Sequence, residues 1–569
     1  MKYSIVEAKE DWFKENINCQ HACPVNTPAS NYIERLQEGD YKGALSLNYM
    51  ANLFPHILGR VCTHPCERAC RKGVIDKPIA ICTLKRAAGD YADSDVLPDM
   101  NLKKVKKSGK KVAIIGAGPS GLAAGNDLAI MGHSVTIYEA LPMAGGMLSV
   151  GIPPYRLPWH KIENAVKWVE DLGIEIKYNS PVKSEEELDC LIKEYDAVYL
   201  AAGAHKSPSL DISGEDLNGV VHGIKFMKDL NLGHQEKVPP KVAVVGGGFT
   251  AIDCARSSLR LGAKEVSIIY RRTLKEMPAG ELEVSMAEEE AIKILFLTTP
   301  VRILGDANSN VKVIECLKNK LGDPDDSGRR RPEPVQGSEF TLPVDMVVAA
   351  IGQSADMSFV SEGLGLRFTK WGSIVVDPKT LMADREGLFV GGDFLTGPRN
   401  VIEVIADGRK VANSIDEYLG VSKEREISYF FKDMDPKRNI DNYDSLPRQK
   451  QQALLMDVRW DVNKEVELGF TKEDAQKEAD RCLLCHFNIF IDDQKCVLCG
   501  GCIDICPHNC IMMISRDKIE SEGLLEGEVK SDWDAVMAID EEKCIRCGLC
   551  VKRCPVDAIT MKRFSYAER

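Results

Sequence analysis

The chain has 569 residues, of which 44% are hydrophobic and 28% charged, a composition that is ordinary for a soluble globular protein of about three or four domains. Its formal net charge of −12 argues against a nucleic-acid or anionic-membrane partner, because both attract basic surfaces. No apolar run reaches the roughly 18 residues that a bilayer span needs, and the N-terminus lacks the basic start and apolar core of a signal peptide. We therefore expect a cytoplasmic protein without a transmembrane segment.

Cysteine is unusually abundant, with twenty in the chain. Thiols in a cytosolic protein rarely stay paired as disulfides, so clustered cysteines there indicate metal or redox chemistry. Sixteen of the twenty fall into groups toward the two ends of the chain. Cys190, Cys254 and Cys316 stand alone and are expected to be small buried apolar residues, and Cys510 is the fourth cysteine outside the groups.

Residues 1–108 are predicted to form a helical iron–sulfur domain. Within it, residues 28–52 indicate two short helices broken at Gly39-Asp40. The basic stretch KKVKKSGKK at 103–111 marks the end of this domain. The cysteines of the domain are Cys19, Cys23, Cys62, Cys66, Cys70 and Cys82.

Residues 110–140 predict a strand, a tight turn, a helix and a second strand, with Gly116, Gly118 and Gly121 in a G-x-G-x-x-G turn. The first glycine permits the turn, the second lets backbone approach a pyrophosphate, and the third lets the helix pack on the strand. The helix N-terminus then offers N–H groups to the phosphates. Because the second strand ends at Glu139, where an acid commonly binds a ribose hydroxyl, a dinucleotide site outweighs a chance glycine loop.

A second unit of the same kind begins at residue 241, with the turn Gly246-x-Gly248-x-x-Ala251. Its second strand ends in Arg271-Arg272, where the first unit has an acid. Arginine suits a ribose 2′-phosphate, so NADP(H) is favoured and NAD(H) is the alternative. Residues 311–345 predict strands around a charged loop whose three consecutive arginines are interpreted as a solvated turn.

Residues 388–412 predict a strand, a glycine turn and a helix, and Asp393 in that turn either bonds a cofactor hydroxyl or caps the turn. Residues 421–480 are charged and poorly periodic. They are predicted to be a linker with one helix near 447–456 and another that starts at Thr471 with a weak capping box.

The C-terminal residues 481–569 contain two runs of the form C-x2-C-x2-C-x3-C-P, separated by an acidic loop. This doubled run is the two-cluster ferredoxin pattern, in which the fourth cysteine of each run binds the other [4Fe–4S] cluster. Zinc sites are disfavoured because they normally use pairs of C-x2-C units rather than triplets. One cluster is therefore assigned to Cys496, Cys499, Cys502 and Cys554, and the other to Cys544, Cys547, Cys550 and Cys506.

Eight further cysteines remain once the ferredoxin ligands are assigned, namely the six of the N-terminal domain together with Cys482 and Cys485. They complete a total of sixteen, enough for four cubane clusters. No nucleophile–base pair or carboxylate dyad stands out, so no catalytic side chain is predicted.

With these motifs in place, the chain resembles the glutamate synthase small (beta) subunit and its relatives, which include the N-terminal half of dihydropyrimidine dehydrogenase. The resemblance covers residues 19–485 and rests on stretches such as GRVCTHPCERAC, GAGPSGLAA, GGMLSVGIPPYRLP and GGGFTAIDCAR. It implies FAD in the first nucleotide fold, held by Gly116, Gly118, Gly121, Glu139, Gly146 and Asp393. It also implies NADP(H) in an inserted second fold, held by Gly246, Gly248, Arg271 and Arg272.

One departure from the family concerns its N-terminal cysteine motif, C-x2-C-x4-C-x3-C-P preceded by E-A-x-R. Only its last two cysteines, Cys19 and Cys23, stand at that end, and the missing half appears as Glu478-Ala-Asp-Arg481-Cys482-Leu-Leu-Cys485. We expect the two halves to meet in space. The family's ligand order then implies one cluster at Cys482, Cys485, Cys19 and Cys70 and another at Cys23, Cys62 and Cys66, with Cys82 as an uncertain fourth ligand.

These observations together predict an α/β fold with two Rossmann-like nucleotide-binding domains, one inserted in the other, between a helical iron–sulfur domain and a ferredoxin-like α+β domain. The FAD domain is assigned residues 109–237 and 351–420, and the NAD(P)H domain residues 238–350. The expected function is electron transfer between NADPH and FAD, and then through the clusters to a ferredoxin or a partner oxidoreductase subunit within a hetero-oligomer. Flow in the opposite direction, a glutamate synthase subunit and a non-catalytic relay subunit are the alternatives.

Overall fold

The computed structural model describes residues 3–4, 8–92, 106–325, 328–421, 427–434, 446–520 and 534–568. The chain divides into two compact units. Unit 1 comprises Met1–Asp99, Lys423–Gln451 and Gly469–Arg569, and unit 2 comprises Met100–Ser422 and Gln452–Leu468. The segment predicted as a linker therefore contributes residues to both units.

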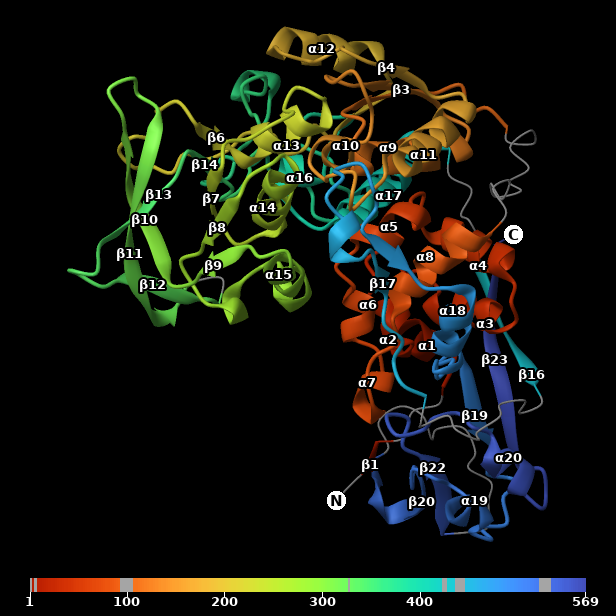
Figure 1. The fold of residues 1–569 in the computed structure, drawn as a ribbon. Coiled ribbons are helices and arrows are strands. Elements are labelled where there is room, and N and C mark those ends of the chain that lie inside the picture. The colour runs from red at the N-terminus through yellow and green to blue at the C-terminus, as the bar shows by residue number, and fades with distance from the viewer. Residues whose placement is uncertain are drawn as a thin grey trace. The chain divides into compact units, whose positions relative to one another are not determined.

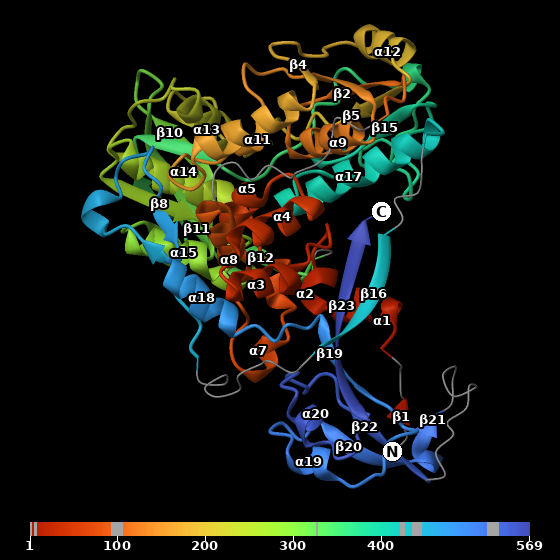
Figure 2. The same cartoon turned by 90° about the vertical axis from the view of Figure 1, so that its right-hand side faces the viewer.

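Unit 2 contains a first parallel sheet with the strand order β15-β5-β2-β3-β4. Residues 112–115 of β2 are all buried, because helices of the same fold cover a parallel sheet on both faces and favour continuous apolar strands. Helix α17 packs against α9, and both are visible beside this sheet in Figure 2. The elements are β2 (Lys111–Ile115), α9 (Pro119–Ile130), β3 (Ser134–Tyr138), α10 (Met147–Val150), α11 (Trp159–Asp171), β4 (Glu175–Lys177), α12 (Glu185–Glu194), β5 (Ala197–Leu200), β15 (Leu388–Val390), α16 (Asp393–Thr396) and α17 (Val401–Tyr418).

A second parallel sheet of unit 2 has the order β6-β14-β7-β8-β9, and all its strands fall between β5 and β15 in the sequence (Figure 1). The second nucleotide fold is therefore inserted in the first, as predicted. Strand β6 precedes residue 238, so the inserted sheet begins earlier than the predicted bound. The elements are β6 (Val220–His222), α13 (Gly223–Asn231), β7 (Lys241–Val245), α14 (Phe249–Arg260), β8 (Glu265–Ile269), α15 (Gly280–Glu289), β9 (Lys293–Leu295) and β14 (Met346–Ala349).

Antiparallel strands extend the inserted fold between β9 and β14. Strand β11 pairs with β10, β12 and β13, and the predicted strands around a charged loop are thereby confirmed. The acidic start of that loop continues β11, and the three arginines follow on its far side. The bounds are β10 (Thr298–Gly305), β11 (Val311–Pro324), β12 (Arg330–Pro334) and β13 (Phe340–Pro343).

The N-terminal part of unit 1 is helical, as predicted. The break expected at Gly39-Asp40 separates α3 from α4, where Asp40 caps α4 by accepting a hydrogen bond from the Gly43 N–H at 2.7 Å. The helices are α1 (Glu10–Asn16), α2 (Asn18–His21), α3 (Ala29–Gln37), α4 (Tyr41–Ala51), α5 (Pro55–Val61), α6 (Pro65–Arg68), α7 (Lys72–Ile75), α8 (Ile81–Tyr91) and α18 (Lys472–Asp480). Helix α18 begins after Thr471, which caps it as predicted by accepting from the Asp474 N–H at 3.0 Å.

The C-terminal part of unit 1 is built from short strands and two short helices. Strand β23 pairs antiparallel with both β16 and β19 (Figure 2), and β20 pairs with β22. The acidic loop predicted between the two cysteine runs lies almost wholly outside the described residues. The elements are β1 (Tyr3–Ser4), β16 (Ile427–Met434), β19 (Phe487–Ile491), α19 (Gly501–Asp504), β20 (Ile511–Ser515), β21 (Ile519–Glu520), β22 (Ala535–Ile539), α20 (Leu549–Arg553) and β23 (Ile559–Glu568).

The helix predicted near 447–456 is absent from the described residues of that range, and the prediction was wrong. The chain there is extended, with β17 (Gln452–Ala453), which pairs with β18 (Glu467–Gly469). Polar contacts from the segment explain the difference: Arg448 donates to the Pro78 carbonyl at 2.6 Å, and the Gln449 N–H donates to Glu478 at 2.8 Å. Elsewhere in the described ranges, no helix has the length and apolar content needed to cross a membrane.

Candidate nucleotide cavity and iron–sulfur sites

Unit 2 contains a cavity of about 1000 Å³ into which both glycine turns open. Gly116, Gly118, Gly246 and Gly248 all line it. Helices α9 and α14 begin directly after these turns without a side-chain cap, so the N–H groups of their first turns are available to phosphates. A cavity with two such termini fits two dinucleotides.

The third glycine of the first turn, Gly121, has a packing role. A Cβ atom there would lie 2.0 Å from the Gly116 carbonyl oxygen and 3.1 Å from the Ile114 side chain. The helix therefore approaches the strand more closely than any side chain allows. In the second turn Ala251 holds the equivalent position and is fully buried.

Two carboxylates predicted to hold FAD line the same cavity, together with Gly146. Glu139 accepts from the Ala117 N–H at 2.8 Å and from the Leu141 N–H at 2.7 Å, yet burial prevails and raises its pKa. Asp393 accepts from the Arg399 N–H at 2.9 Å, and burial raises its pKa to about 6. Both acids therefore lie in the cavity with their side chains fixed by backbone N–H groups.

The arginines after β8 have different surroundings. Arg272 is buried, donates to the Arg330 carbonyl at 2.7 Å and pairs with Asp325 at 2.5 Å. Arg271 lines the cavity and is exposed; its carbonyl accepts from the Asn319 side chain at 3.1 Å, whereas its guanidinium makes no hydrogen bond or ion pair with another described residue. Partial burial and the neighbouring guanidinium groups of Arg272 and Arg329 lower the pKa of Arg271. Such a concentration of positive charge favours an anion.

Arg329 is a cavity residue that the sequence analysis missed. It belongs to the three arginines interpreted as a solvated turn, and it is indeed exposed, but it also lines the nucleotide cavity. The hairpin of β11 and β12 brings it there, and no local pattern in the sequence indicates that placement.

Within unit 1, the two halves of the split cysteine motif come together as expected. Cys19, Cys70, Cys482 and Cys485 line one cavity. The first two come from the N-terminal helical region, whereas the last two follow α18.

A buried ion pair fixes this meeting of distant segments. Glu478 accepts from the Ala80 N–H at 2.8 Å and pairs with Arg481 at 2.7 Å. Arg481 in turn pairs with Asp76 at 2.8 Å and donates to the Lys77 carbonyl at 2.8 Å. Both members of the Glu478–Arg481 pair are fully buried, so the acid and arginine of the motif act as a clamp between α18 and the N-terminal helices.

A second group in the helical region surrounds the buried Lys85. Burial would lower the pKa of Lys85, but Cys23, Cys62, Cys66 and Cys82 outweigh it and raise that pKa. The Cys82 thiol donates to the Leu58 carbonyl at 3.1 Å. Its place in the group supports Cys82 as the fourth member, although its role as a ligand stays a prediction.

The ferredoxin part has a cavity lined by Cys506, Cys544, Cys547 and Cys550, the set assigned to one cluster from the spacing. Of the other predicted set, Cys499 lies near Arg553, the residue before Cys554: a Cβ atom added at Gly501 would be 3.8 Å from the Cys499 sulfur and 3.7 Å from the Arg553 side chain. Cys499 is exposed. We name these the inner site (Cys506, Cys544, Cys547, Cys550) and the outer site (Cys496, Cys499, Cys502, Cys554).

The cysteines of the two cavities in unit 1 stand around a space. Among the described residues, no three His, Cys, Asp or Glu side chains come close enough to hold a single ion. A cubane cluster is held by four thiolates, and four predicted ligands line each of the two cavities.

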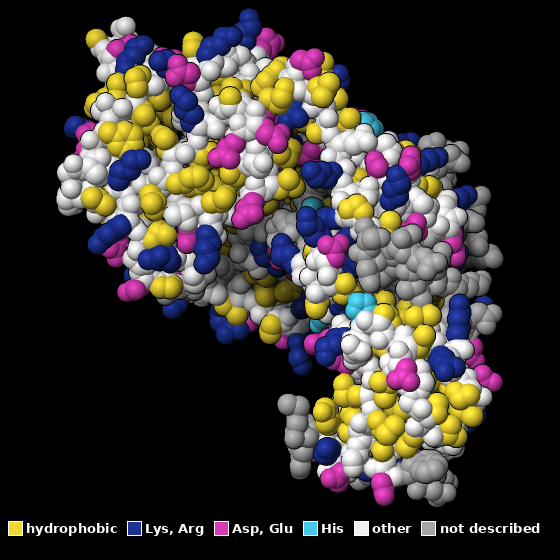
Figure 3. Space-filling view, turned by 60° about the horizontal axis from the view of Figure 1, so that its bottom comes forward, with side chains coloured by type: hydrophobic (Ala, Val, Ile, Leu, Met, Phe, Trp, Pro, Cys, Tyr) yellow, Lys and Arg dark blue, Asp and Glu magenta, His cyan; other side chains and the backbone are white. Residues whose placement is uncertain are grey.

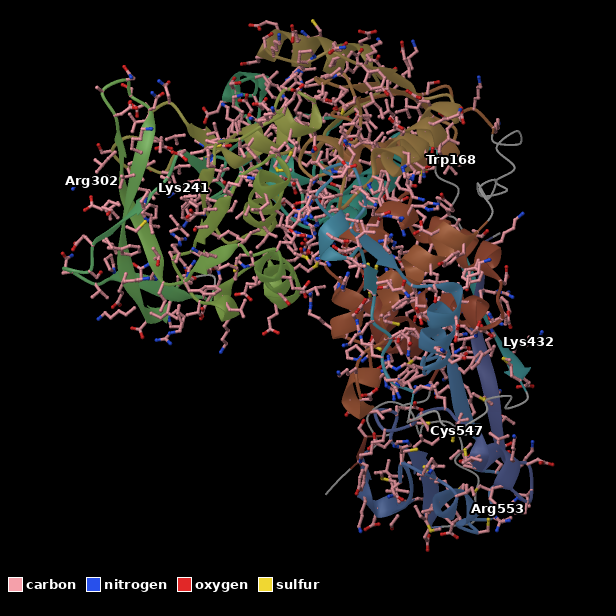
Figure 4. The ribbon with its side chains drawn as sticks, viewed as in Figure 1. Trp168, Lys241, Arg302, Lys432, Cys547 and Arg553 are labelled. Carbon is pink, nitrogen blue, oxygen red and sulfur yellow. The ribbon has the colours of Figure 1, made fainter. Side chains whose placement is uncertain are left out.

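The inner site lies next to the site of Cys19, Cys70, Cys482 and Cys485. The buried Leu483 and Ile545 pack together with Cys485 and Cys547. Figure 4 labels Cys547, on the side of the ferredoxin part that faces the N-terminal helices, and Arg553, farther from them. Arg71, which follows Cys70, donates to the Cys544 carbonyl at 3.4 Å.

The cysteines outside the predicted sites differ among themselves. Cys254 and Cys316 are fully buried, as expected of apolar residues. Cys190 is exposed, and the expectation of burial was wrong, because α12 buries Leu188 and Leu191 instead. Cys510 is buried and lines the inner cavity, a position that the sequence analysis missed.

Comparison with known families gives three matches along the chain. The pyridine nucleotide-disulphide oxidoreductase family matches residues 110–408. The dihydropyrimidine dehydrogenase domain II, 4Fe-4S cluster family matches residues 4–96, and the 4Fe-4S dicluster domain matches residues 495–558. These matches confirm the predicted fold class and the order of its parts.

Curated relatives extend over most of the chain. The NADP(+)-dependent formate dehydrogenase subunit beta of Moorella thermoacetica is 42% identical over 82% of this chain and 70% of its own length. The NADPH-Fe(3+) oxidoreductase subunit beta of Geobacter sulfurreducens is 39% identical over 82% of this chain and 75% of its own. The glutamate synthase [NADPH] small chain of Escherichia coli is 33% identical over 71% of this chain and 89% of its own, in agreement with the family resemblance drawn from the motifs.

Proposed function

Because the chain belongs to the pyridine nucleotide-disulphide oxidoreductase family, we propose that it is the NADP(H)-linked electron-transfer subunit of a larger cytoplasmic oxidoreductase complex. Family membership establishes an oxidoreductase that uses FAD and a nicotinamide dinucleotide, and the two iron–sulfur matches establish [4Fe–4S] clusters. The proposal adds the choice of nucleotide, the four cluster sites, their order and the partner.

Contact between the inner site and the preceding cluster site is the observation that carries this proposal. Leu483 and Ile545 pack between ligands of both sites. The Arg71 side chain also joins them, because it donates to the carbonyl of Cys544. A storage or structural role would not need adjacent sites, whereas single-electron transfer does. The outer site, with its exposed Cys499, is the exit or entry point for a partner.

Bound cofactors supply the redox chemistry: nicotinamide and flavin exchange a hydride, and the clusters carry single electrons. The residues of this chain hold the cofactors in place. Gly116, Gly118 and the first turn of α9 bind the FAD pyrophosphate, and Glu139 accepts from a ribose hydroxyl. Gly246 and Gly248 bind the second pyrophosphate in the same cavity, which supports direct contact between the two cofactors.

NADP(H) is the proposed nucleotide because Arg271 and Arg329 both line the cavity, where a 2′-phosphate is stabilised by charge-assisted hydrogen bonds. Arg272 supports them indirectly. Its guanidinium is engaged by Asp325 and the Arg330 carbonyl, so it positions the loop. The first two relatives described above are named for NADP(+) and NADPH, which agrees with this choice.

The proposed partner is a catalytic oxidoreductase subunit that docks at the outer site, in a hetero-oligomer. The first two relatives are themselves named as beta subunits. Hydrophobic side chains appear at the ferredoxin end of unit 1 in Figure 3, and Val497, Ile505 and Val556 of that region are 37–48% exposed. Val497 and Val556 lie close to Cys496 and Cys554 of the outer site in sequence, and Ile505 precedes Cys506 of the inner site, so a partner that covered Val497 and Val556 would approach the outer cluster.

Anaerobic titration of the purified protein with NADPH, and separately with NADH, tests the proposal. We expect NADPH to bleach the flavin and then the cluster absorbance, with NADH much less effective. A Cys499→Ala variant should accept fewer electrons in total while its flavin is reduced as before. If neither nucleotide reduces the FAD-loaded protein, or if flavin reduction never reaches the clusters, the proposed function is wrong.

A further inference from the structure

The two cysteine runs of the ferredoxin part are followed by stretches of the same pattern, in which a Cys-Pro pair is followed four residues after the cysteine by a small residue and then an isoleucine. One run continues as Cys506-Pro-His-Asn-Cys510-Ile511, and the other as Cys554-Pro-Val-Asp-Ala558-Ile559. Cys510 therefore corresponds to Ala558.

The structure preserves this repeat closely. The Cys510 N–H donates to the Cys506 sulfur at 3.3 Å, and the Ala558 N–H donates to the Cys554 sulfur at 3.2 Å. The residues just before them, Asn509 and Asp557, adopt φ values of 49° and 50°. Both turns lead directly into a strand, β20 or β23. The two positions thus share one backbone geometry and differ only by a sulfur atom.

That additional sulfur lies at the inner site. The Cys510 sulfur is 3.3 Å from the Cys506 sulfur, and Cys510 lines the cavity together with Cys506, Cys544, Cys547 and Cys550. The cavity therefore has five cysteines for a cluster that uses four. A packing role alone does not require the thiol, because the fully equivalent position 558 is filled by a methyl group and is 1% exposed.

We propose that Cys510 is an interchangeable ligand of the inner cluster, able to replace Cys506 on the same iron. This inference rests on the proposed inner site. In the exchange, the iron–sulfur bond to Cys506 breaks and a bond to Cys510 forms, while the proton of the Cys510 thiol passes to the released Cys506 thiolate. No electron is gained or lost, and no further reactant takes part.

The position of the inner site gives the exchange a consequence. This site adjoins Leu483 and the cluster site before it, so loss of its cluster would interrupt the proposed electron path. The outer site has Ala558 at the corresponding position and therefore lacks a fifth cysteine that could replace a ligand there. A ligand exchange also changes the hydrogen bond that the Cys510 N–H donates to the liganding sulfur, and such hydrogen bonds set cluster potentials.

Alanine variants of the full-length protein, purified anaerobically, test the proposal by iron and sulfide content and by the electron paramagnetic resonance of the reduced clusters. The matched pair is Cys506→Ala in the inner site and Cys554→Ala in the outer site. We expect Cys506→Ala to keep its iron, with one cluster signal shifted. Cys554→Ala and the double variant Cys506→Ala/Cys510→Ala should each lose about a quarter of the iron, one of four clusters.

A transfer of the thiol provides an independent test. Adding Ala558→Cys to Cys554→Ala should restore the lost iron, because it recreates the geometry of the inner site. If Cys506→Ala loses as much iron as the double variant and Ala558→Cys restores none, ligand exchange is refuted while the proposed clusters stand. If neither Cys554→Ala nor the double variant loses iron, the proposed cluster sites are wrong and the exchange falls with them.

Discussion

Alanine substitution of each arginine near the nucleotide cavity should have a different effect, because each guanidinium has different surroundings. Arg271 lines the cavity, and its guanidinium has no hydrogen bond or ion pair with another described residue, so a 2′-phosphate would gain its full charge-assisted hydrogen bond. Such a bond contributes about 1.5–3 kcal/mol. Arg271→Ala should therefore weaken NADP⁺ binding by about 10- to 150-fold and leave NAD⁺ binding nearly unchanged.

Substitution of the other two arginines should give smaller or less selective effects. Arg329 is exposed, where an ion pair contributes only about 0–1 kcal/mol, so Arg329→Ala should weaken NADP⁺ up to about fivefold. Arg272 is 4% exposed and pairs with Asp325, whose side chain is 23% exposed. Arg272→Ala should destabilise the fold by up to about 3 kcal/mol, since it removes the buried guanidinium that pairs with that acid, and weaken both nucleotides together.

Calorimetric titration with NADP⁺, NAD⁺, 2′-phospho-AMP and AMP separates these outcomes, because the last two differ only in the 2′-phosphate. Arg331→Ala is the control, since this arginine is exposed on the same hairpin and is not among the described residues that line the cavity. Equal weakening of 2′-phospho-AMP and AMP by Arg271→Ala would refute the assignment. The assignment would also be refuted if neither Arg271→Ala nor Arg329→Ala changed the binding of 2′-phospho-AMP.

Three further predictions concern the carboxylates and the split motif. Burial raises the pKa of Asp393 from 3.8 to about 6, so the folded FAD-free protein binds more protons than the unfolded chain in that interval and loses stability as pH rises through it. Asp393→Asn should remove that loss of stability, which is about 3 kcal/mol at most at pH 7, and should weaken FAD binding. Chemical denaturation at pH 4.5 and pH 7 measures the free energy of unfolding of both proteins. The same change between the two pH values in the variant and the parent protein would contradict the prediction. Arg481→Ala should destabilise unit 1 by about 3–5 kcal/mol because the buried Glu478 loses its guanidinium partner. Arg367→Ala, which breaks an exposed pair with Asp384, should leave thermal unfolding nearly unchanged because solvent screens such a pair. Equal shifts in thermal unfolding for the two variants would refute the clamp. Cys19→Ala and Cys482→Ala should abolish the same cluster signal and lower bound iron equally, and a loss in only one of them would show that the two halves do not share a cluster.

Features set by neighbouring residues could be predicted from the sequence. The two glycine turns follow from the spacing of small residues between an apolar strand and a helix. The break between α3 and α4 follows from Gly39-Asp40, and the start of α18 follows from Thr471, whose hydroxyl accepts a backbone hydrogen bond. In each case a few adjacent side chains decide the backbone conformation, so their pattern is sufficient.

Features decided by distant partners could not be predicted in the same way. The segment near 447–456 has a helical pattern, yet its backbone is extended because Arg448 and Gln449 bond to Pro78 and Glu478. The three arginines at 329–331 have the composition of a solvated loop, yet Arg330 and Arg331 begin β12, and only the direction of the hairpin brings Arg329 to the nucleotide cavity. Helical propensity and local polarity contain no information about either contact.

The cysteine sites were partly predictable from the sequence, although their ligands come from distant segments, and the reason is chemical. A cluster requires four thiolates, so regular runs identify ligands even when the chain between them is unknown, as with the ferredoxin cysteines. The split motif was recoverable because Glu478 and Arg481 travel with Cys482 and Cys485, and the structure uses that acid and arginine to join α18 to the helix-rich N-terminal region. Cys510 could not be recognised by counting ligands, because the other cysteines already supply four ligands to each cluster. A comparison of the two halves of the repeat identifies Cys510, because it differs from Ala558 by a single sulfur atom while the backbone turn around the two positions is the same.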